Sequence, residues 1–572
     1  MGNDNTANDT ASDNTDVDNA DIGSTDVDNA DIDNTDVDNA DIDNTDVDNA
    51  DVDSDGSSTA TSRRAVVRAL GTGASVAAVT GTASAHTFGS TSGSTDSGHD
   101  HSDGSLHGST SDVELLEYHS LGDLGPSSES SASDPHYGGI DEVRVRGDYA
   151  YVGFFTSKDP TNNRGLGVVD ISEFNAADST SELRDAEMDF QSFVRNDNDA
   201  ASVMDVKVSA DGDYVFFTKQ PISLLFDDPD PTPSDDGSST DTLTGAVTAV
   251  DVTNKSDPTV VGTYPHDTGF HNCFHHTIDG QDYVFVIKDI DDGTSGLYVF
   301  TFDRAAGALT LVNTWNRDGN LLDANVTGGA TYIHDIVVQD DARLDKPVGY
   351  LSYWNAGLYA LDLSDPTDIS PIGHFDMSNC HYSEPAPTYI DGKRVVIAGQ
   401  EIPSQSDGTT GKLYLLDADG IDGTWDGEDN MVELDSWEWR SNETFDDYTF
   451  SPHNFTVTDD GWVHVGHYHG GTRFLRLDSD DWTLTEKGYF RAAKDVPEDS
   501  KVVGLNHAAP FAWTAVRQQG VTYVADINTG LYALRYKPDS TSASVGTALG
   551  LGLLGALGKR YGVLDGLLGD SE

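Results

Sequence analysis

Histidines recur at one point of a repeated sequence unit, the beginning of an apolar run. Of the 18 histidines, 12 follow residue 260, and four of these open such runs. The four are His275 in HNCFHHTI, His334 in YIHDIVV, His453 in SPHNFTV and His507 in LNHAAPF. Neutral imidazole is a good ligand for iron, copper, zinc or nickel. In a fold that gathers the beginnings of these runs, the histidines would form one mononuclear metal site.

Other units place further histidines or acidic side chains at or near the same point. The phrase NCHYSEPAP carries His381 and Glu384, and His271 precedes His275 by four residues. A carboxylate beside a ligating imidazole can hold its second nitrogen and so orient the ring. The predicted ligand set is His275, His334, His453, His507, His381, Glu384 and His271.

The acidic residues at this point also have a purely structural interpretation. Asp205 and Asp335 stand just before an apolar run in a pattern that looks like part of the repeat, and Asp141-Glu142 has that place in the first unit. Such carboxylates would bond the backbone of the next unit, and a histidine beside them would do the same. Both interpretations stay open from the sequence.

Two cysteines, Cys273 and Cys380, each lie beside this histidine cluster. In an exported protein a disulfide is the first expectation. Two buried thiols are an equal alternative, and a thiolate ligand that favours copper is a third. The sequence contains no Ser-His-Asp elbow, phosphate loop or CxxC pair.

The segment that carries these residues, about 113–537, consists of short apolar runs separated by Gly, Asp, Asn and Pro. This texture is typical of many short antiparallel strands. Seven times, a strand such as DYVFF is followed by a loop and a strand such as GLYVFTFD. Small sheets that each bury two faces against neighbours close into a ring. We therefore predict an all-β fold, a seven-bladed β-propeller of four-stranded antiparallel blades, whose innermost strands bring the histidines to the mouth of a central channel.

Two phrases combine an apolar run, an aspartate, a small turn and a Pro-led strand. They are AVTAVDVTNKSDPTVVGTYP at 246–265 and LYALDLSDPTDISPIGHF at 358–375. In these features the chain resembles the LVIVD-repeat family of β-propellers, over about 140–536. The resemblance implies the fold and no particular activity, because propellers host many functions.

The ends of the chain differ in composition from this segment. Residues 1–60 repeat the phrase DNTDVDNADI with few apolar groups, so we expect a disordered acidic tail. Residues 61–85 resemble a twin-arginine export signal, with Arg63 and Arg64 before an apolar run that ends at Ala85. Residues 86–112 are expected to form a flexible Ser/Gly/His linker. Residues 538–572 are expected to form a flexible tail, whose apolar run is too short to span a membrane.

The net charge of the chain argues against two classes of partner. Acidic residues outnumber basic ones 99 to 32, which gives a formal net charge of −67. Nucleic acid and anionic membrane surfaces would be repelled. Such a surface keeps a protein soluble in strong salt, which is typical of extreme halophiles, and with the export signal it indicates a haloarchaeal-type secreted or cell-surface protein.

The functional expectation is a histidine-lined channel mouth that binds a transition metal (iron, copper or zinc) or a small ligand. A non-catalytic surface module that holds a cell-surface protein or a glycan through its loops is the alternative. An oxidoreductase that uses iron or copper is a second alternative. Whether the chain is an enzyme is not decided by its sequence.

Overall fold

The computed structural model describes residues 95–96, 99–100, 107–119, 121, 139–156, 165–195, 201–221, 245–289, 295–316, 332–402, 410–439, 449–492 and 510–537. The predicted acidic tail, the predicted export signal with Arg63, Arg64 and Ala85, His507 and the predicted C-terminal tail lie outside the described residues.

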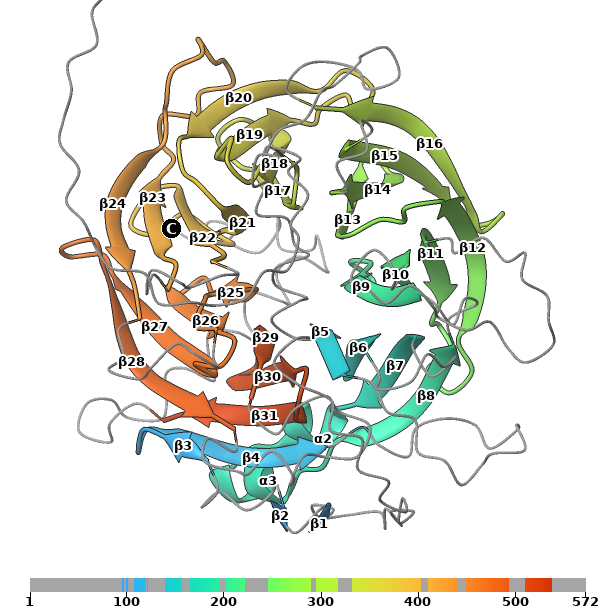
Figure 1. The fold of residues 1–572 in the computed structure, drawn as a ribbon, viewed down its shortest axis with the longest axis vertical. Coiled ribbons are helices and arrows are strands. Elements are labelled where there is room, and N and C mark those ends of the chain that lie inside the picture. Colours follow the sequence, from blue (N-terminus) through green and yellow to red (C-terminus); the bar gives the residue numbers. More distant parts are fainter. Residues whose placement is uncertain are drawn as a thin grey trace, which may run out of the picture. The chain divides into compact units, whose positions relative to one another are not determined.

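Seven antiparallel sheets surround a common axis, so the predicted seven-bladed propeller is confirmed (Figure 1). We number the blades 1–7 in chain order of their innermost strands. These are β5 (Gly139–Arg146), β9 (Ala201–Val208), β13 (Cys273–Ile278), β17 (Asp335–Asp341), β21 (Cys380–Pro385), β25 (Phe455–Val457) and β29 (Ala512–Gln518). The second strands are β6 (Tyr149–Thr156), β10 (Tyr214–Pro221), β14 (Gln281–Lys288), β18 (Lys346–Ser352), β22 (Val395–Gln400), β26 (Trp462–Gly466) and β30 (Val521–Asp526).

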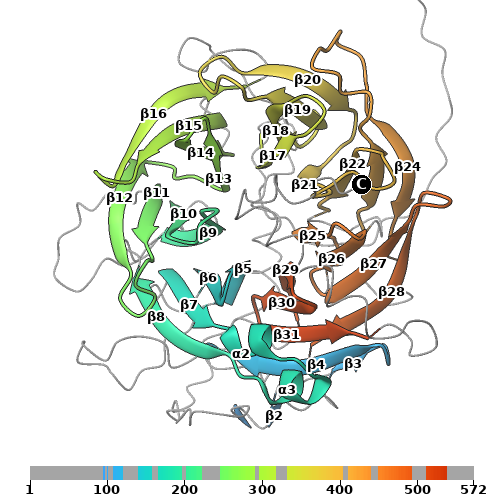
Figure 2. The ribbon, with the colours of Figure 1, turned by 180° about the vertical axis from the view of Figure 1, so that it is seen from behind.

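The remaining two strands of each blade lie towards the rim, as the view from behind also shows (Figure 2). The third strands are β7 (Gly165–Asp170), β11 (Gly245–Asp251), β15 (Gly296–Asp303), β19 (Leu358–Asp362), β23 (Leu413–Asp417), β27 (Thr472–Asp478) and β31 (Gly530–Tyr536). The outermost strands are β8 (Asp189–Arg195), β12 (Thr259–His266), β16 (Ala308–Trp315), β20 (Ser370–Phe375), β24 (Val432–Trp437), β28 (Thr483–Arg491) and, in blade 7, β4 (Val113–His119).

A few short elements stand outside this plan. The strand β3 (Gly108–Ser109) adds to the rim of blade 6, and β1 (Thr95–Asp96) pairs with β2 (His99–Asp100). Helices α2 (Ser172–Ala176) and α3 (Thr180–Asp185) connect β7 to β8. Within the described ranges, no helix has the length and apolar character needed to cross a membrane.

An aspartate ends the third strand in six of the seven blades and explains why the repeat contains it. In blade 2, one carboxylate oxygen of Asp251 accepts hydrogen bonds from the backbone amide and the hydroxyl of Thr253. This local turn competes with continued sheet pairing and so ends the strand. The same bond, to the amide two residues on, is made by Asp170, Asp303, Asp362, Asp417 and Asp478.

The core is divided among the blade boundaries. Each pair of neighbouring blades buries one cluster of apolar side chains, and blade 7 shares such a cluster with blade 1. Because burial of apolar surface is the main favourable term in folding, these boundaries hold the ring together.

The ring closes with a strand from before blade 1. Strand β4 pairs antiparallel with β31, so blade 7 contains both the first and the last long strands of the described chain. The buried Tyr118 hydroxyl of β4 also donates a hydrogen bond to the Thr529 carbonyl, 2.6 Å away. Blade 7 is therefore incomplete without the segment that precedes blade 1.

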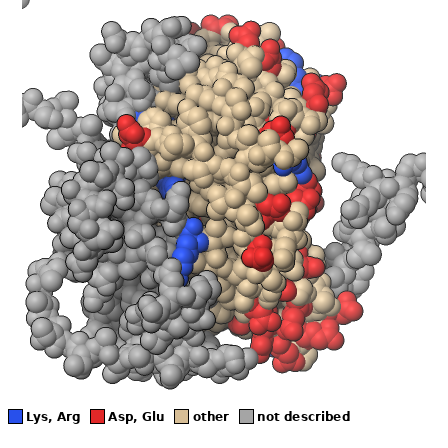
Figure 3. All heavy atoms as spheres, turned by 90° about the vertical axis from the view of Figure 1, so that its right-hand side faces the viewer, with Lys and Arg blue, Asp and Glu red and all other residues tan. Residues whose placement is uncertain are grey.

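One side of the propeller shows the excess of acidic residues that the composition contains. Figure 3 shows the side formed by β12 and β16, where Asp and Glu side chains gather along one edge and Lys and Arg are few. Carboxylates on this surface face solvent, so their mutual repulsion depends on ionic strength.

Candidate metal centre

Four buried histidines stand at the starting ends of consecutive inner strands. His271, His334 and His453 lie just before β13, β17 and β25, and His381 is the second residue of β21. The first three have equivalent backbone positions, because the backbone amide of each donates a hydrogen bond to a carbonyl oxygen in the second strand of its own blade. The acceptors are Ile287, Ser352 and Gly466, respectively. The repeat thus delivers one imidazole per blade from blade 3 to blade 6.

His381 reaches this position by an irregularity. The register between β21 and β22 shifts between Cys380 and Tyr382, so His381 has no partner of its own in the ladder. A β-bulge of this kind redirects a side chain and is common beside functional sites.

The four imidazoles form a continuous arc. Ring centres are 5.1 Å apart for His271 and His334, 3.9 Å for His334 and His381, and 4.2 Å for His381 and His453. Beyond His453 the arc continues with the indole of Trp513 in blade 7, at 3.8 Å. None of the four histidines is more than 3% exposed, so the arc is an interior feature.

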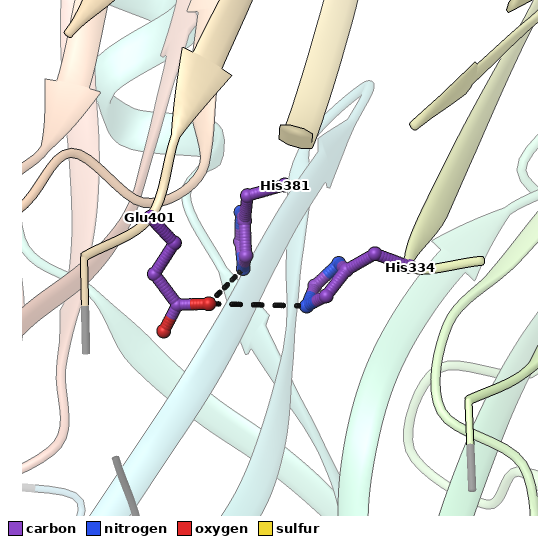
Figure 4. A group of neighbouring side chains, drawn as sticks. All are labelled: His334, His381 and Glu401. Atoms are coloured by element: carbon purple, nitrogen blue, oxygen red, sulfur yellow. Dashed lines mark ion pairs between the residues drawn. The ribbon is translucent and has the colours of Figure 1, made fainter. Parts of the chain in front are cut away.

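A carboxylate lies against the middle of the arc. Glu401 follows β22 directly and is 2% exposed. Its Oε2 is 3.3 Å from Nε2 of His381 and 4.0 Å from Nε2 of His334 (Figure 4). One ligand atom from each of the three residues lies within 4.8 Å of the other two. Among the described residues, this is the group of histidine, cysteine and acidic side chains that converges closely enough for a metal ion.

Tyrosine and tryptophan side chains fix the positions of this group. The Tyr468 hydroxyl donates a hydrogen bond to Oε1 of Glu401, which leaves Oε2 turned towards the histidines. The indole of Trp354 stacks on His334, with ring centres 5.5 Å apart. Trp354 and Tyr468 both have positive φ, 31° and 39°, and strain of this kind in bulky residues concentrates at functional sites.

Two imidazoles and one carboxylate are a donor set suited to divalent transition metals. Metal–nitrogen and metal–oxygen bonds of about 2.0–2.2 Å place neighbouring ligand atoms roughly 3–3.5 Å apart. The separations of Glu401 from His381 and His334 are close to this range, so modest side-chain rotation would suffice to bind an ion.

A second layer of polar side chains lies one residue further along the inner strands and ties the blades together. Asp205 of blade 2 accepts a hydrogen bond from the backbone amide of Cys273 in blade 3, 2.8 Å away. Asn272 of blade 3 donates to Asp335 of blade 4, at 2.6 Å. Burial raises the pKa of Asp335. The bond made by Asp205 is the structural role that the repeat pattern suggested for its aspartates.

Other predicted ligands lie away from the cluster. His275 pairs with Asp282, Nε2 to Oδ1 3.0 Å, and stacks on Phe216 of blade 2. Burial lowers the pKa of His275. Glu384 accepts hydrogen bonds from the Tyr382 hydroxyl and from the backbone amide of Val457 in blade 6, and burial raises its pKa to about 7. Both side chains stabilise blade boundaries.

Asp141 is not part of the three-residue group. One of its carboxylate oxygens accepts the backbone amide of Glu142, and burial raises its pKa. With His507 outside the described residues, the structure leaves His271, His334, His381 and His453 as the predicted histidines that it brings together.

The two cysteines are buried free thiols. Cys273 packs between blades 2 and 3, and Cys380 between blades 4 and 5. Burial raises the pKa of both thiols, that of Cys380 to about 11. A disulfide between them is therefore not present, and the alternative of two buried thiols describes the structure.

Glu401 and Tyr468 are the members of the site that the sequence analysis did not name. Both follow the second strand of a blade, as does Trp354. The signal for them in the sequence is the set of residues that follow the second strands. The histidines of the predicted site belong to the beginnings of the first strands.

Comparison with known proteins concerns the fold. Residues 138–175 match the LVIVD repeat family model, from the start of β5 into α2. No curated protein matches the sequence.

Several solved propellers are similar in structure. One is U3-55K, with 9% identity, a TM-score of 0.43 and coverage of 74% of this chain and 99% of that chain. The WD40 β-propeller domain of Doa1 has 10% identity, a TM-score of 0.40 and coverage of 76% and 100%. The periplasmic gluconolactonase PpgL of Pseudomonas aeruginosa has 9% identity, a TM-score of 0.42 and coverage of 68% and 96%.

Proposed function

From the premise that this chain is an LVIVD-repeat β-propeller, we propose that it binds a divalent transition metal ion between His334, His381 and Glu401. The observation that carries the proposal is the convergence of these three buried side chains from two blades. Imidazole suits iron, copper, zinc and nickel, and the carboxylate favours a divalent ion.

The charge of the bound ion would be partly balanced on site. One carboxylate and two neutral imidazoles leave a bound divalent ion with a net charge of one. The buried carboxylate of Glu401 thus favours a cation over an anionic ligand at this position.

Metal analysis tests this proposal directly. The full chain, folded in molar salt and stripped with a chelator, would be loaded in turn with Fe²⁺, Cu²⁺, Zn²⁺ and Ni²⁺, and the bound metal counted. We expect about one ion per chain, and loss of binding in His334→Gln, His381→Gln and Glu401→Gln. His275→Gln is the matched control, since this buried histidine pairs with Asp282 and should leave binding unchanged.

The outcomes separate the candidate functions. Stoichiometric iron or copper would extend the proposal to an oxidoreductase. Absence of any bound ion in the wild-type chain would leave the surface interaction module as the function.

We also propose that the chain acts outside the cytoplasm of a halophilic organism. The support is the twin-arginine segment at 61–85 and the net charge of −67.

A further inference from the structure

His271 and His453 are the outermost histidines of the arc. Each has one ring nitrogen in a hydrogen bond that defines its tautomer. Nδ1 of His453 is 3.1 Å from the backbone carbonyl oxygen of Trp513. A carbonyl oxygen only accepts hydrogen bonds, so Nδ1 must carry the proton. Nε2 of His453 is then the basic nitrogen, with its lone pair in the ring plane.

The tautomer of His271 follows from two successive hydrogen bonds. Nδ1 of His271 is 3.2 Å from Oε1 of Gln220, and Nε2 of Gln220 donates to Oδ1 of Asp289 at 2.5 Å. Because a carboxylate accepts, the Asp289 contact sets the orientation of the Gln220 amide and turns its oxygen to His271. Nδ1 of His271 is therefore the donor and Nε2 the basic nitrogen.

This arrangement is the one that metal-ligating histidines show. They donate one ring N–H to a carbonyl or carboxylate, which fixes the tautomer and the ring orientation and makes the other nitrogen a better ligand. Here the bonds come from neighbouring blades, from blade 7 to His453 and from blade 2 to His271. Each of the two outer rings is thus held by the blade next to its own.

The spacing of the arc also suits a single ion. Imidazoles bound side by side to one metal, with metal–nitrogen bonds of about 2.1 Å, place their ring centres roughly 4.5 Å apart. The three gaps along the arc are 5.1, 3.9 and 4.2 Å. Consecutive rings of the arc thus have about the spacing of imidazoles that share an ion. Nitrogens of His271 and His453 lie outside the group of His334, His381 and Glu401, so binding would have to draw these two rings inward.

We propose that His271 and His453 are further ligands of the metal centre, which becomes a site of four imidazoles and one carboxylate. This inference rests on the proposed function, since it requires an ion between His334, His381 and Glu401. A site rich in imidazole selects copper, iron or nickel over the oxygen-preferring Mg²⁺ and Ca²⁺. Five protein ligands leave one position of an octahedral ion for a small molecule.

The test counts imidazoles in the wild-type chain and needs no variant to fold. Full-length protein loaded with one equivalent of Cu²⁺ would be studied by pulsed electron paramagnetic resonance, in which the remote nitrogen of each bound imidazole contributes to the spectrum. We expect more than two bound imidazoles. A count of two would overturn the inference and leave the three-residue site intact, whereas failure to bind Cu²⁺ or any other ion would overturn the proposed function itself.

Variants supply a second readout. His271→Gln and His453→Gln should each remove one imidazole from the spectrum and weaken Cu²⁺ binding about 10-fold to 100-fold, while His275→Gln should change neither. His453→Gly should regain affinity when free imidazole is added, an effect that a purely structural role would not produce. Unchanged spectra and affinity in both glutamine variants would contradict the inference.

Discussion

Tyr468 and Glu401 are 67 residues apart in the sequence and are joined by a buried hydrogen bond from blade 6 to blade 5. The bond engages Oε1 of the carboxylate, so Oε2 is the atom that lies 3.3 Å from His381. The phenol therefore determines which oxygen is presented to the histidines.

Removal of this hydroxyl should weaken metal binding without abolishing it. In Tyr468→Phe the carboxylate can rotate, and loss of such an outer partner typically costs 10-fold to 100-fold in metal affinity. Competition titration against a chromophoric chelator would measure the change. Tyr118→Phe is the control, because its hydroxyl bonds the Thr529 carbonyl in blade 7 and its loss should lower stability alone. Equal affinity in Tyr468→Phe and wild type would show that Glu401 is held by other contacts.

His464 should make the fold sensitive to mild acid. It is buried in blade 6 with Nδ1 2.9 Å from the Thr522 hydroxyl, and burial lowers its pKa to about 3. The unfolded chain binds a proton near pH 6.5, but the folded chain does not until about pH 3, so stability falls as pH decreases between these values. At pH 5 the loss is about 2 kcal/mol.

Chemical denaturation of wild type and His464→Gln at pH 7.5 and pH 5 would isolate this contribution. We expect the difference in free energy of unfolding between the two proteins to change by about 2 kcal/mol in favour of the variant at the lower pH. Parallel pH profiles would mean that His464 titrates alike in the folded and unfolded chains.

Ring closure by β4 can be tested by truncation. A chain that starts at 107 retains β3 and β4, whereas one that starts at 120 leaves β31 as an unpaired edge. We expect the longer chain to melt like the full-length protein. The shorter one should melt at lower temperature and aggregate, because an exposed strand edge pairs with other chains. Identical melting of the two would show that β4 adds little to the ring.

Salt should be required for the fold. Self-repulsion among carboxylates is screened within about 3 Å at 1 M salt and over roughly 30 Å at 0.01 M. With 99 acidic and 32 basic residues, the melting temperature should fall steeply as salt is diluted, with unfolding at low ionic strength. Circular dichroism across a salt series measures this, and a melting temperature independent of salt would contradict the halophilic assignment.

Export should depend on the arginine pair. Replacement of both Arg63 and Arg64 by lysine keeps the charge but removes the paired guanidinium groups that define the twin-arginine signal. We expect the precursor to remain in the cell, as detected by blotting of cell and medium fractions. Arg68→Lys, in the same segment but outside the pair, should be exported normally. Secretion of the double variant would refute the twin-arginine route.

The fold could be predicted from the sequence for a physical reason. In six of the seven blades an apolar run ends in an aspartate, and Asp251 shows why, since its carboxylate forms the turn that stops the strand. Seven such units require seven buried boundaries, which the structure contains.

The site was harder to predict from the sequence, because the positions of its side chains depend on the register of the strands. His271 and His275 are only four residues apart, but His271 alone lies just before its inner strand, where blades 4 and 6 also place their histidines. His381 is positioned by a bulge that no local signal announces. Glu401 comes from a second strand, and its approach to His334 depends on the packing of blade 5 against blade 4.

The pairing of β4 with β31 also sets an order of events during synthesis. The Tyr118–Thr529 bond spans 411 residues, so the contact that closes the ring cannot form until nearly the whole propeller has been made. Contacts this distant in sequence slow folding, and an unpaired strand edge is prone to aggregation while it waits. Every nascent chain therefore carries β4 exposed until blade 7 emerges, and the strong negative charge of its surroundings would keep such chains apart during that interval.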